Sequence, residues 1–181
     1  MFIAQQLRQS NIAEYLLYMW QVEDTIRAFG CSLSRIRREY IDKFDYTDEQ
    51  KEEEAVWFCK PNKMMNEEGC RESGHLQINK VTLQLLEELH AQLTQSTKFP
   101  FYTSEYYKVL PFIVELRNRG AHKDDGEVET CLNLLYGVMM LRLQHKEISP
   151  DTTHALKEVT TLVGMLSDYY KKDKEEPLEF D

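Results

Sequence analysis

A regular apolar stripe between residues 76 and 96 constrains the fold of this chain most strongly. Apolar residues recur there at intervals of three or four positions, which places them on one face of an α-helix. They are Ile78, Val81, Leu85, Leu89 and Leu93, with Leu86 beside them. A stripe of this kind is typical of a helix that packs against other helices.

The same spacing predicts a helix over residues 10–28. Ser10 or Asn11 is suited to its N-cap, because a short polar side chain can accept a hydrogen bond from a free backbone N–H. Trp20 and the tyrosines nearby widen its apolar face and are expected in the core. The stripe itself contains one acid and consists of Ile12, Leu16, Met19, Glu23 and Ile26.

Two further helix starts are well marked. Thr47 is followed three positions later by Gln50, which is the pattern of a capping box. Ser149 is followed by Pro150, the order expected of an N-cap and the first helical residue. Between them, Pro61 should kink or split its helix, because proline lacks the N–H that a helix interior needs.

The chain shows no alternation of apolar and polar residues that would indicate strands, and it holds only 7 glycines and 5 prolines in 181 residues. We therefore predict an all-α, single-domain helical bundle of six or seven helices. The domain should cover residues 1–171. Residues 172–181 are expected to form a charged, frayed C-terminal tail.

The composition excludes several classes of protein. A net charge of −9 argues against a broad electrostatic footprint for nucleic acid. The four cysteines form no C-x-x-C pair, so we expect reduced thiols in a cytoplasmic protein. The start of the chain lacks the pattern of a signal peptide. The longest charge-free apolar stretch, residues 130–141, is too short for a bilayer, so no membrane partner is expected.

The sequence predicts neither a metal nor a cofactor. Cys70 and His75 lie close together, but no second pair of potential ligands accompanies them. Glu87 and His90 form a single E-x-x-H pair, whereas a di-iron bundle needs two such pairs and two more glutamates. We therefore expect His90 at the surface or at the boundary of the core.

Arg117, Asn118 and His122 form the pattern R-N-x-x-x-H, which is the best candidate for chemistry. His122 could serve as a general base or acid near neutral pH. Arg117 could hold a phosphate and stabilise charge in the transition state, while Asn118 could orient either group. In an unbroken helix residues five apart point about 140° apart. The two would therefore converge only if Gly120 turned the backbone, or across a dimer.

This pattern resembles the signature of HEPN domains, a family of all-helical bundles. The resemblance implies a metal-independent endoribonuclease or a nucleotide-binding domain, with RNA or a nucleotide as partner. It also implies a site built across a homodimer. The alternative is that Arg117 and Arg119 end a helix before Gly120, so that the chain is a non-catalytic helical module that binds a protein partner or itself.

A second resemblance covers more of the chain. Residues 11–21 and 74–80 are similar to a bacterial single-domain family of about this length that has no assigned function. This resemblance implies a protein made of one helical domain, and it implies no activity.

Overall fold

The computed structural model describes residues 2–119 and 123–181, in which every regular element is helical. The expected all-α class is confirmed, but these residues form eight α-helices where we predicted six or seven. In chain order the elements are α1 (Phe2–Ser10), α2 (Ile12–Ala28), α3 (Leu33–Glu39), the short 3-10 helix η1 (Ile41–Lys43), α4 (Asp48–Glu67), α5 (Gln77–Gln95), α6 (Pro100–Arg119), α7 (Glu127–Leu143) and α8 (Pro150–Glu175).

Helix α1 is one element that the sequence did not reveal. Five of its nine residues are polar, and Ala4 is buried in the core. It packs against α2, and Ile3 and Leu7 recur at helical spacing, but a helix of nine residues depends on tertiary contact for its stability. Asn11 separates the two helices and caps α2, because its Oδ1 accepts from the backbone N–H groups of Ala13 and Glu14, both at 3.1 Å.

Helix α4 runs unbroken through Pro61, so the expected split is absent. Proline removes one helical hydrogen bond, while burial of its ring offsets part of that loss. The capping box that starts α4 is confirmed: Gln50 N donates to Thr47 Oγ1 at 3.2 Å, and Thr47 N donates to Gln50 Oε1 at 3.0 Å. Ser149 likewise caps α8 by accepting from Thr152 N at 3.1 Å.

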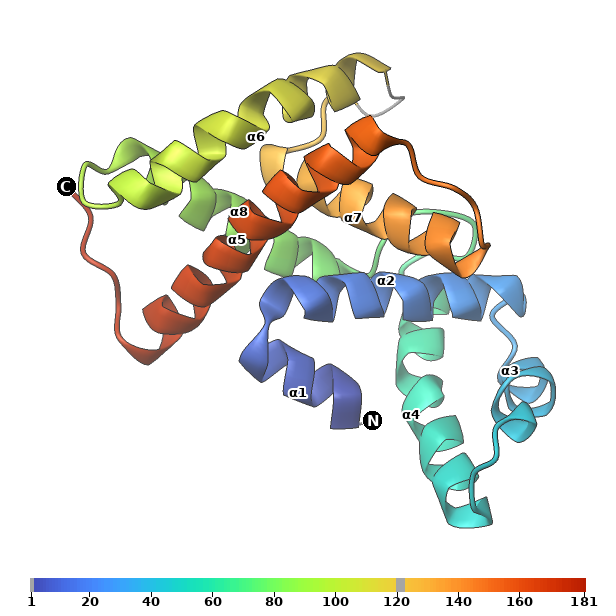
Figure 1. Ribbon diagram of the computed structural model, residues 1–181. Coiled ribbons are helices and arrows are strands. Elements are labelled where there is room, and N and C mark those ends of the chain that lie inside the picture. Colours follow the sequence, from blue (N-terminus) through green and yellow to red (C-terminus); the bar gives the residue numbers. More distant parts are fainter. Residues whose placement is uncertain (1, 120–122) are drawn as a thin grey trace.

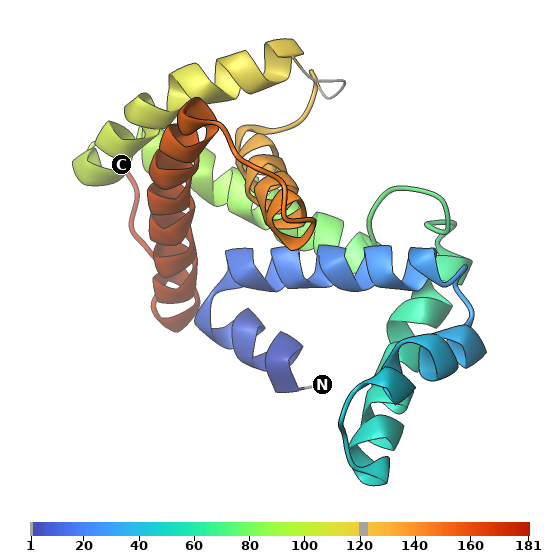
Figure 2. The same ribbon diagram turned by 45° about the vertical axis from the view of Figure 1, so that its right-hand side comes forward.

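Helix α7 contacts α2, α5, α6 and α8, and α8 contacts α2, α5, α6 and α7. Helices α3 and α4 extend to one side of the molecule, away from α6 and α8, as Figures 1 and 2 show. Residues 172–175, which we assigned to the tail, extend α8. The last residue returns to the start of α6, where Asp181 Oδ2 accepts hydrogen bonds from Thr97 N and Thr97 Oγ1, both at 2.6 Å.

Helix α5 is rotated relative to its apolar stripe. Its C-terminal half buries Leu86, Leu89 and Leu93, but its N-terminal half leaves Ile78, Val81 and Leu85 exposed by 38%, 45% and 38%. Asn79 and Thr82 are buried in their place, and His90 is buried further along the helix. The expectation that His90 lies at the surface or boundary is therefore wrong: its side chain is inside the bundle.

Candidate functional site

Arg117 lies in the last turn of α6 and is half-buried between α6 and α7. Its Nε donates to Thr130 Oγ1 at 3.3 Å, and its Nη2 donates to the carbonyl oxygen of Asp125. The guanidinium group therefore ties the end of α6 to the start of α7. A guanidinium carries five N–H donors, so these two contacts do not use all of them.

The structure describes Arg117 and Asn118 of the R-N-x-x-x-H pattern but not His122. Asn118 is exposed to solvent at the end of α6. His122 lies outside the described residues, as does Gly120, so the convergence of Arg117 and His122 stays a prediction. An open cleft of about 480 Å³ adjoins Arg117, and it is lined mainly by apolar side chains of α6 and α7.

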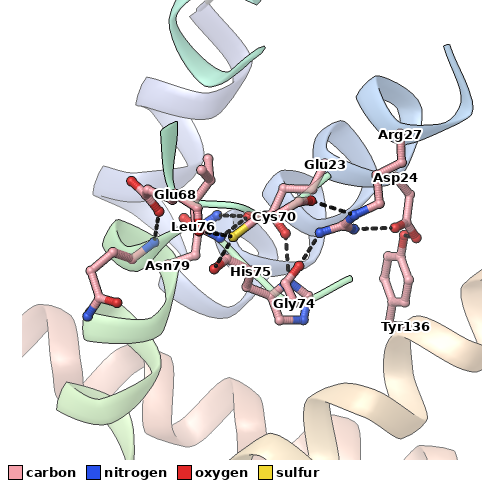
Figure 3. Close-up of polar contacts among 11 residues, drawn as sticks. Glu23, Asp24, Arg27, Glu68, Cys70, Gly74, His75, Leu76, Asn79 and Tyr136 are labelled. Atoms are coloured by element: carbon pink, nitrogen blue, oxygen red, sulfur yellow. Dashed lines mark hydrogen bonds and ion pairs between the residues drawn. The ribbon is translucent and has the colours of Figure 1, made fainter. Parts of the chain in front are cut away.

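A second polar cluster, which the sequence analysis missed, is centred on the carboxylate of Glu23 in α2. This side chain is fully buried, and three donors converge on it. His75 Nδ1 lies 2.6 Å from Oε2, while Leu76 N and Asn79 Nδ2 donate to Oε1 at 2.9 and 2.7 Å. The Trp20 ring stacks on the His75 ring with 4.5 Å between centroids. Figure 3 shows the polar contacts of Glu23 with His75, Leu76 and Asn79.

The loop that carries His75 is fixed to the same helix. Arg27 Nε donates to the carbonyl of Cys70 at 3.2 Å, and Arg27 Nη2 donates to that of Gly74. The Cys70 thiol donates to the carbonyl of His75 at 3.3 Å, so it does not face the imidazole as a joint ligand would. The contacts drawn in Figure 3 hold the histidine in place against a buried acceptor.

A third cluster surrounds His90 inside the bundle. His90 Nδ1 lies 2.6 Å from the hydroxyl of Tyr102, and His90 Nε2 lies 3.0 Å from Glu127 Oε2. The Tyr106 hydroxyl donates to Glu127 Oε1 at 3.2 Å. Burial and this hydrogen bond raise the pKa of Tyr106 to about 12. These contacts join α5, α6 and α7, and the adjoining cavity holds only about 10 Å³.

The described residues contain no group of three histidine, cysteine, aspartate or glutamate side chains placed to hold a metal ion. Within the same part of the chain, no helix is both long enough and apolar enough to span a bilayer.

The comparisons with known proteins supply a family and no activity. No curated protein and no solved structure matches the chain. One family model, described as a domain of unknown function (DUF4924), matches residues 1–177. Since this match covers nearly the whole sequence, the chain belongs to the DUF4924 family.

Proposed function

We propose that this chain is a non-catalytic helical module that pairs with a second copy of itself through α5. The observation that carries the proposal is the exposed part of the apolar stripe, Ile78, Val81 and Leu85. These side chains recur at positions i, i+3 and i+7, so they form one continuous face of the helix. Such a face, exposed on a folded chain, is typical of an interaction surface.

The charges on this face favour a second copy in an antiparallel arrangement. Each copy carries a net charge of −9, so two copies approach most easily where charges are few. Gln77 and Gln84 flank the stripe, and Glu88 is the acid next to it. A two-fold axis beside Val81 would place Ile78 against Leu85 of the other copy. It would also keep the two Glu88 side chains about 20 Å apart along the helix, whereas parallel helices would bring them together.

Charge substitutions at Val81 test this arrangement, because a two-fold axis sets this position against itself. Val81→Glu and Val81→Arg should each give a monomer in light scattering, since like charges would meet at the axis. An equimolar mixture of the two variants should recover the dimer mass, because opposite charges then meet.

Val56 provides the matched control. It is an exposed apolar residue of α4, with 61% of its surface accessible, and it lies outside the stripe. Val56→Glu should leave the dimer intact. A monomeric wild-type protein at high micromolar concentration would refute the proposal, as would a Val81→Glu variant that remains dimeric.

A HEPN-like RNA-processing function is the second candidate, favoured by the guanidinium of Arg117 beside an open cleft. In this scheme His122 accepts the proton of the RNA 2′-hydroxyl, whose oxygen attacks phosphorus while the 5′-oxygen of the next nucleotide leaves and takes up a proton from water. Arg117 stabilises charge at phosphorus, and Asn118 orients Arg117 or His122. The products would carry a 2′,3′-cyclic phosphate, and chelators would have no effect.

The test of this second candidate is cleavage of RNA by the purified protein. His122→Ala and Arg117→Ala should each abolish cleavage, and Asn118→Ala should reduce it. Lys60→Ala removes an exposed positive charge on α4 and should leave cleavage unchanged. If the wild-type protein cleaves no RNA, or cleavage survives His122→Ala, the catalytic assignment is wrong.

We also infer that the protein acts in the bacterial cytoplasm. The support for this setting is the resemblance of residues 11–21 and 74–80 to a bacterial family, together with the state of the thiols. All four cysteines are free, and three of them are buried. A reducing compartment preserves thiols in this state. Fractionation of the source cells, with detection of the protein by antibody, tests the location.

A further inference from the structure

Residues 176–181, called the tail segment here, run from the end of α8 back to the start of α6 (Figure 1). Their side chains alternate between the bundle and the solvent. Leu178 and Phe180 are half-buried and pack against the core, whereas Pro177 and Glu179 are exposed. This alternation is typical of an extended peptide that places every second side chain in a groove.

An aromatic groove receives Phe180. The centroid of its ring lies 5.4 Å from that of Phe99, and the Phe99 ring lies 5.3 Å from that of Tyr169 in α8. Tyr169 also contacts the fully buried ring of Tyr102, with 5.8 Å between centroids. The walls of the groove are therefore anchored on the core by contacts that do not involve Phe180.

A carboxylate site adjoins the groove just before α6. Asp181 Oδ2 accepts hydrogen bonds from Thr97 Oγ1 and Thr97 N, both at 2.6 Å, and from Ser96 Oγ at 3.2 Å. The hydrogen bond from the Thr97 hydroxyl, followed by that from its backbone N–H, lowers the pKa of Asp181. The site therefore favours an ionised carboxylate directly after an aromatic residue.

Positive charge lies beside the groove, although the net charge of the chain is −9. Lys98 Nζ lies 3.9 Å from Glu179 Oε2. Lys172 Nζ lies 5.3 Å from the centre of the Tyr169 ring. The groove is therefore complementary to an acidic segment rather than to a basic one.

The tail segment is held mainly by these side-chain contacts. Its backbone lies outside every helix of the described chain. Glu176 N donates to the carbonyl of Lys172 at 2.8 Å, and Leu178 N donates to Asp173 Oδ1 at 2.9 Å. A segment with so few backbone contacts can leave its groove without unfolding a helix.

We propose that this groove is a docking site for a short acidic segment of a partner protein, and that the tail segment is a strap that competes for it. The partner segment is extended, and it carries an apolar residue, an aromatic residue two positions later and a carboxylate directly after that. The tail segment shows this chemistry, because Leu178, Phe180 and Asp181 are the side chains that the groove holds. The groove lies beyond the C-terminal end of α5, so it does not require the pairing face in the N-terminal half of that helix.

Nuclear magnetic resonance of the ¹⁵N-labelled full chain tests the proposal, because the amide signal of Thr97 reports whether the carboxylate site is filled. Phe180→Ala combined with Asp181→Asn should release the tail segment and shift this signal. The amidated peptide of residues 176–181 should then return the signal saturably toward its wild-type position. The wild-type protein should bind the peptide about tenfold more weakly, because a tethered strap has an effective concentration of roughly a millimolar.

Glu179→Gln is the matched control, since it removes the same charge from a side chain that is 92% exposed. It should leave the Thr97 signal in place. Thr97→Val, added to the released variant, should weaken binding of the peptide about fivefold through loss of the hydroxyl donor. Circular dichroism checks that each variant is folded.

Three results would overturn the proposal. The first is the absence of saturable peptide binding to the released variant. The second is equal affinity of the released variant and the wild type, because the strap would then not compete. The third is undiminished binding of a peptide that carries Phe180→Ala and Asp181→Asn, because the groove would then not read these side chains.

Discussion

Glu23 and His75 lie 52 residues apart in the chain, yet the carboxylate of one lies 2.6 Å from the imidazole of the other inside the bundle. A buried carboxylate is costly unless donors replace the water it loses. Here the imidazole, the backbone N–H of Leu76 and the amide of Asn79 replace that water. The pairing fixes the loop before α5 and the rotation of α5 at the same time.

Removal of this carboxylate should destabilise the fold strongly. Glu23→Ala leaves three donors without an acceptor, two of them buried (Leu76 N and Asn79 Nδ2) and one on the half-buried His75 ring, and we expect a loss of about 3 kcal/mol or more in the free energy of unfolding. Glu23→Gln retains one acceptor oxygen and should lose less. Urea denaturation followed by circular dichroism measures both. Glu14→Gln, at an exposed position of the same helix, should change the free energy by less than about 0.5 kcal/mol. Equal stability of the Glu23→Ala and Glu14→Gln variants would show that the buried contacts contribute nothing.

Alanine substitutions at two glycines, Gly126 just before α7 and Gly137 inside it, should change the stability of the protein in opposite directions. A β-carbon added at Gly126 would lie 2.0 Å from Glu87 Oε1, the atom that accepts from Glu129 N at the start of α7. Gly126→Ala should therefore displace this carboxylate and cost about 1 to 3 kcal/mol. At Gly137, inside α7, an added β-carbon meets no atom within 4 Å. Gly137→Ala should stabilise the protein by up to about 1 kcal/mol, because alanine is the better helix former.

Thermal melts of the two variants measure these changes directly. The double variant Gly126→Ala with Glu87→Ala should lose no more stability than Glu87→Ala alone, since the clash is then gone. A Gly126→Ala variant as stable as the wild type would show that Glu87 has an equally good position elsewhere.

The helices themselves could be predicted from the sequence, because their periodicity and caps are local. Asn11, Thr47 and Ser149 each cap a helix from within four residues, so their roles are visible in a short stretch of chain. The rotation of α5 could not be predicted in this way. Hydrophobicity favours the face of Ile78, but the structure buries the face of Asn79, whose partner Glu23 is distant in the sequence.

The polar clusters were missed for the same reason, although one signal was present. Glu23 lies on the apolar stripe of its helix, and a carboxylate on a buried face requires donors from elsewhere in the fold. The sequence alone does not say which donors these are. His90 gives no comparable signal: its partners Tyr102 and Glu127 come from two other helices. The relation of Arg117 to His122 remains a prediction, since His122 lies outside the described residues.

The hydroxyl of Tyr102 should contribute measurably to stability, because it meets His90 Nδ1 at 2.6 Å in a fully buried position. Tyr102→Phe removes the hydroxyl and leaves the ring nitrogen without this partner, which should cost about 1 to 3 kcal/mol. Tyr107→Phe is the control, since Tyr107 lies in the same helix with 64% of its surface exposed. Denaturant unfolding should give a clearly lower free energy of unfolding for Tyr102→Phe than for Tyr107→Phe. Similar losses of free energy in the two variants would contradict the structural role of the hydrogen bond.

The stability of the protein should depend on the charge of Glu129. Burial, together with repulsion from Asp125 and Glu87, raises the pKa of this carboxyl in the folded state. A carboxyl with a raised pKa binds its proton more tightly when folded than when unfolded. Its contribution to stability is therefore lost as the pH rises from the unfolded pKa through the folded one.

Glu129→Gln removes this ionisable group, so the variant should melt at a higher temperature than the wild type at pH 7. The difference should shrink as the pH falls through the range in which carboxyl groups titrate, because the wild-type side chain then becomes neutral as well. Glu53→Gln, on the exposed face of α4, should show no such dependence. Melting curves of the three proteins between pH 4 and pH 7 test this expectation. A melting temperature of Glu129→Gln that equals that of the wild type at pH 7, or exceeds it by the same amount across the range, would contradict the raised pKa of Glu129.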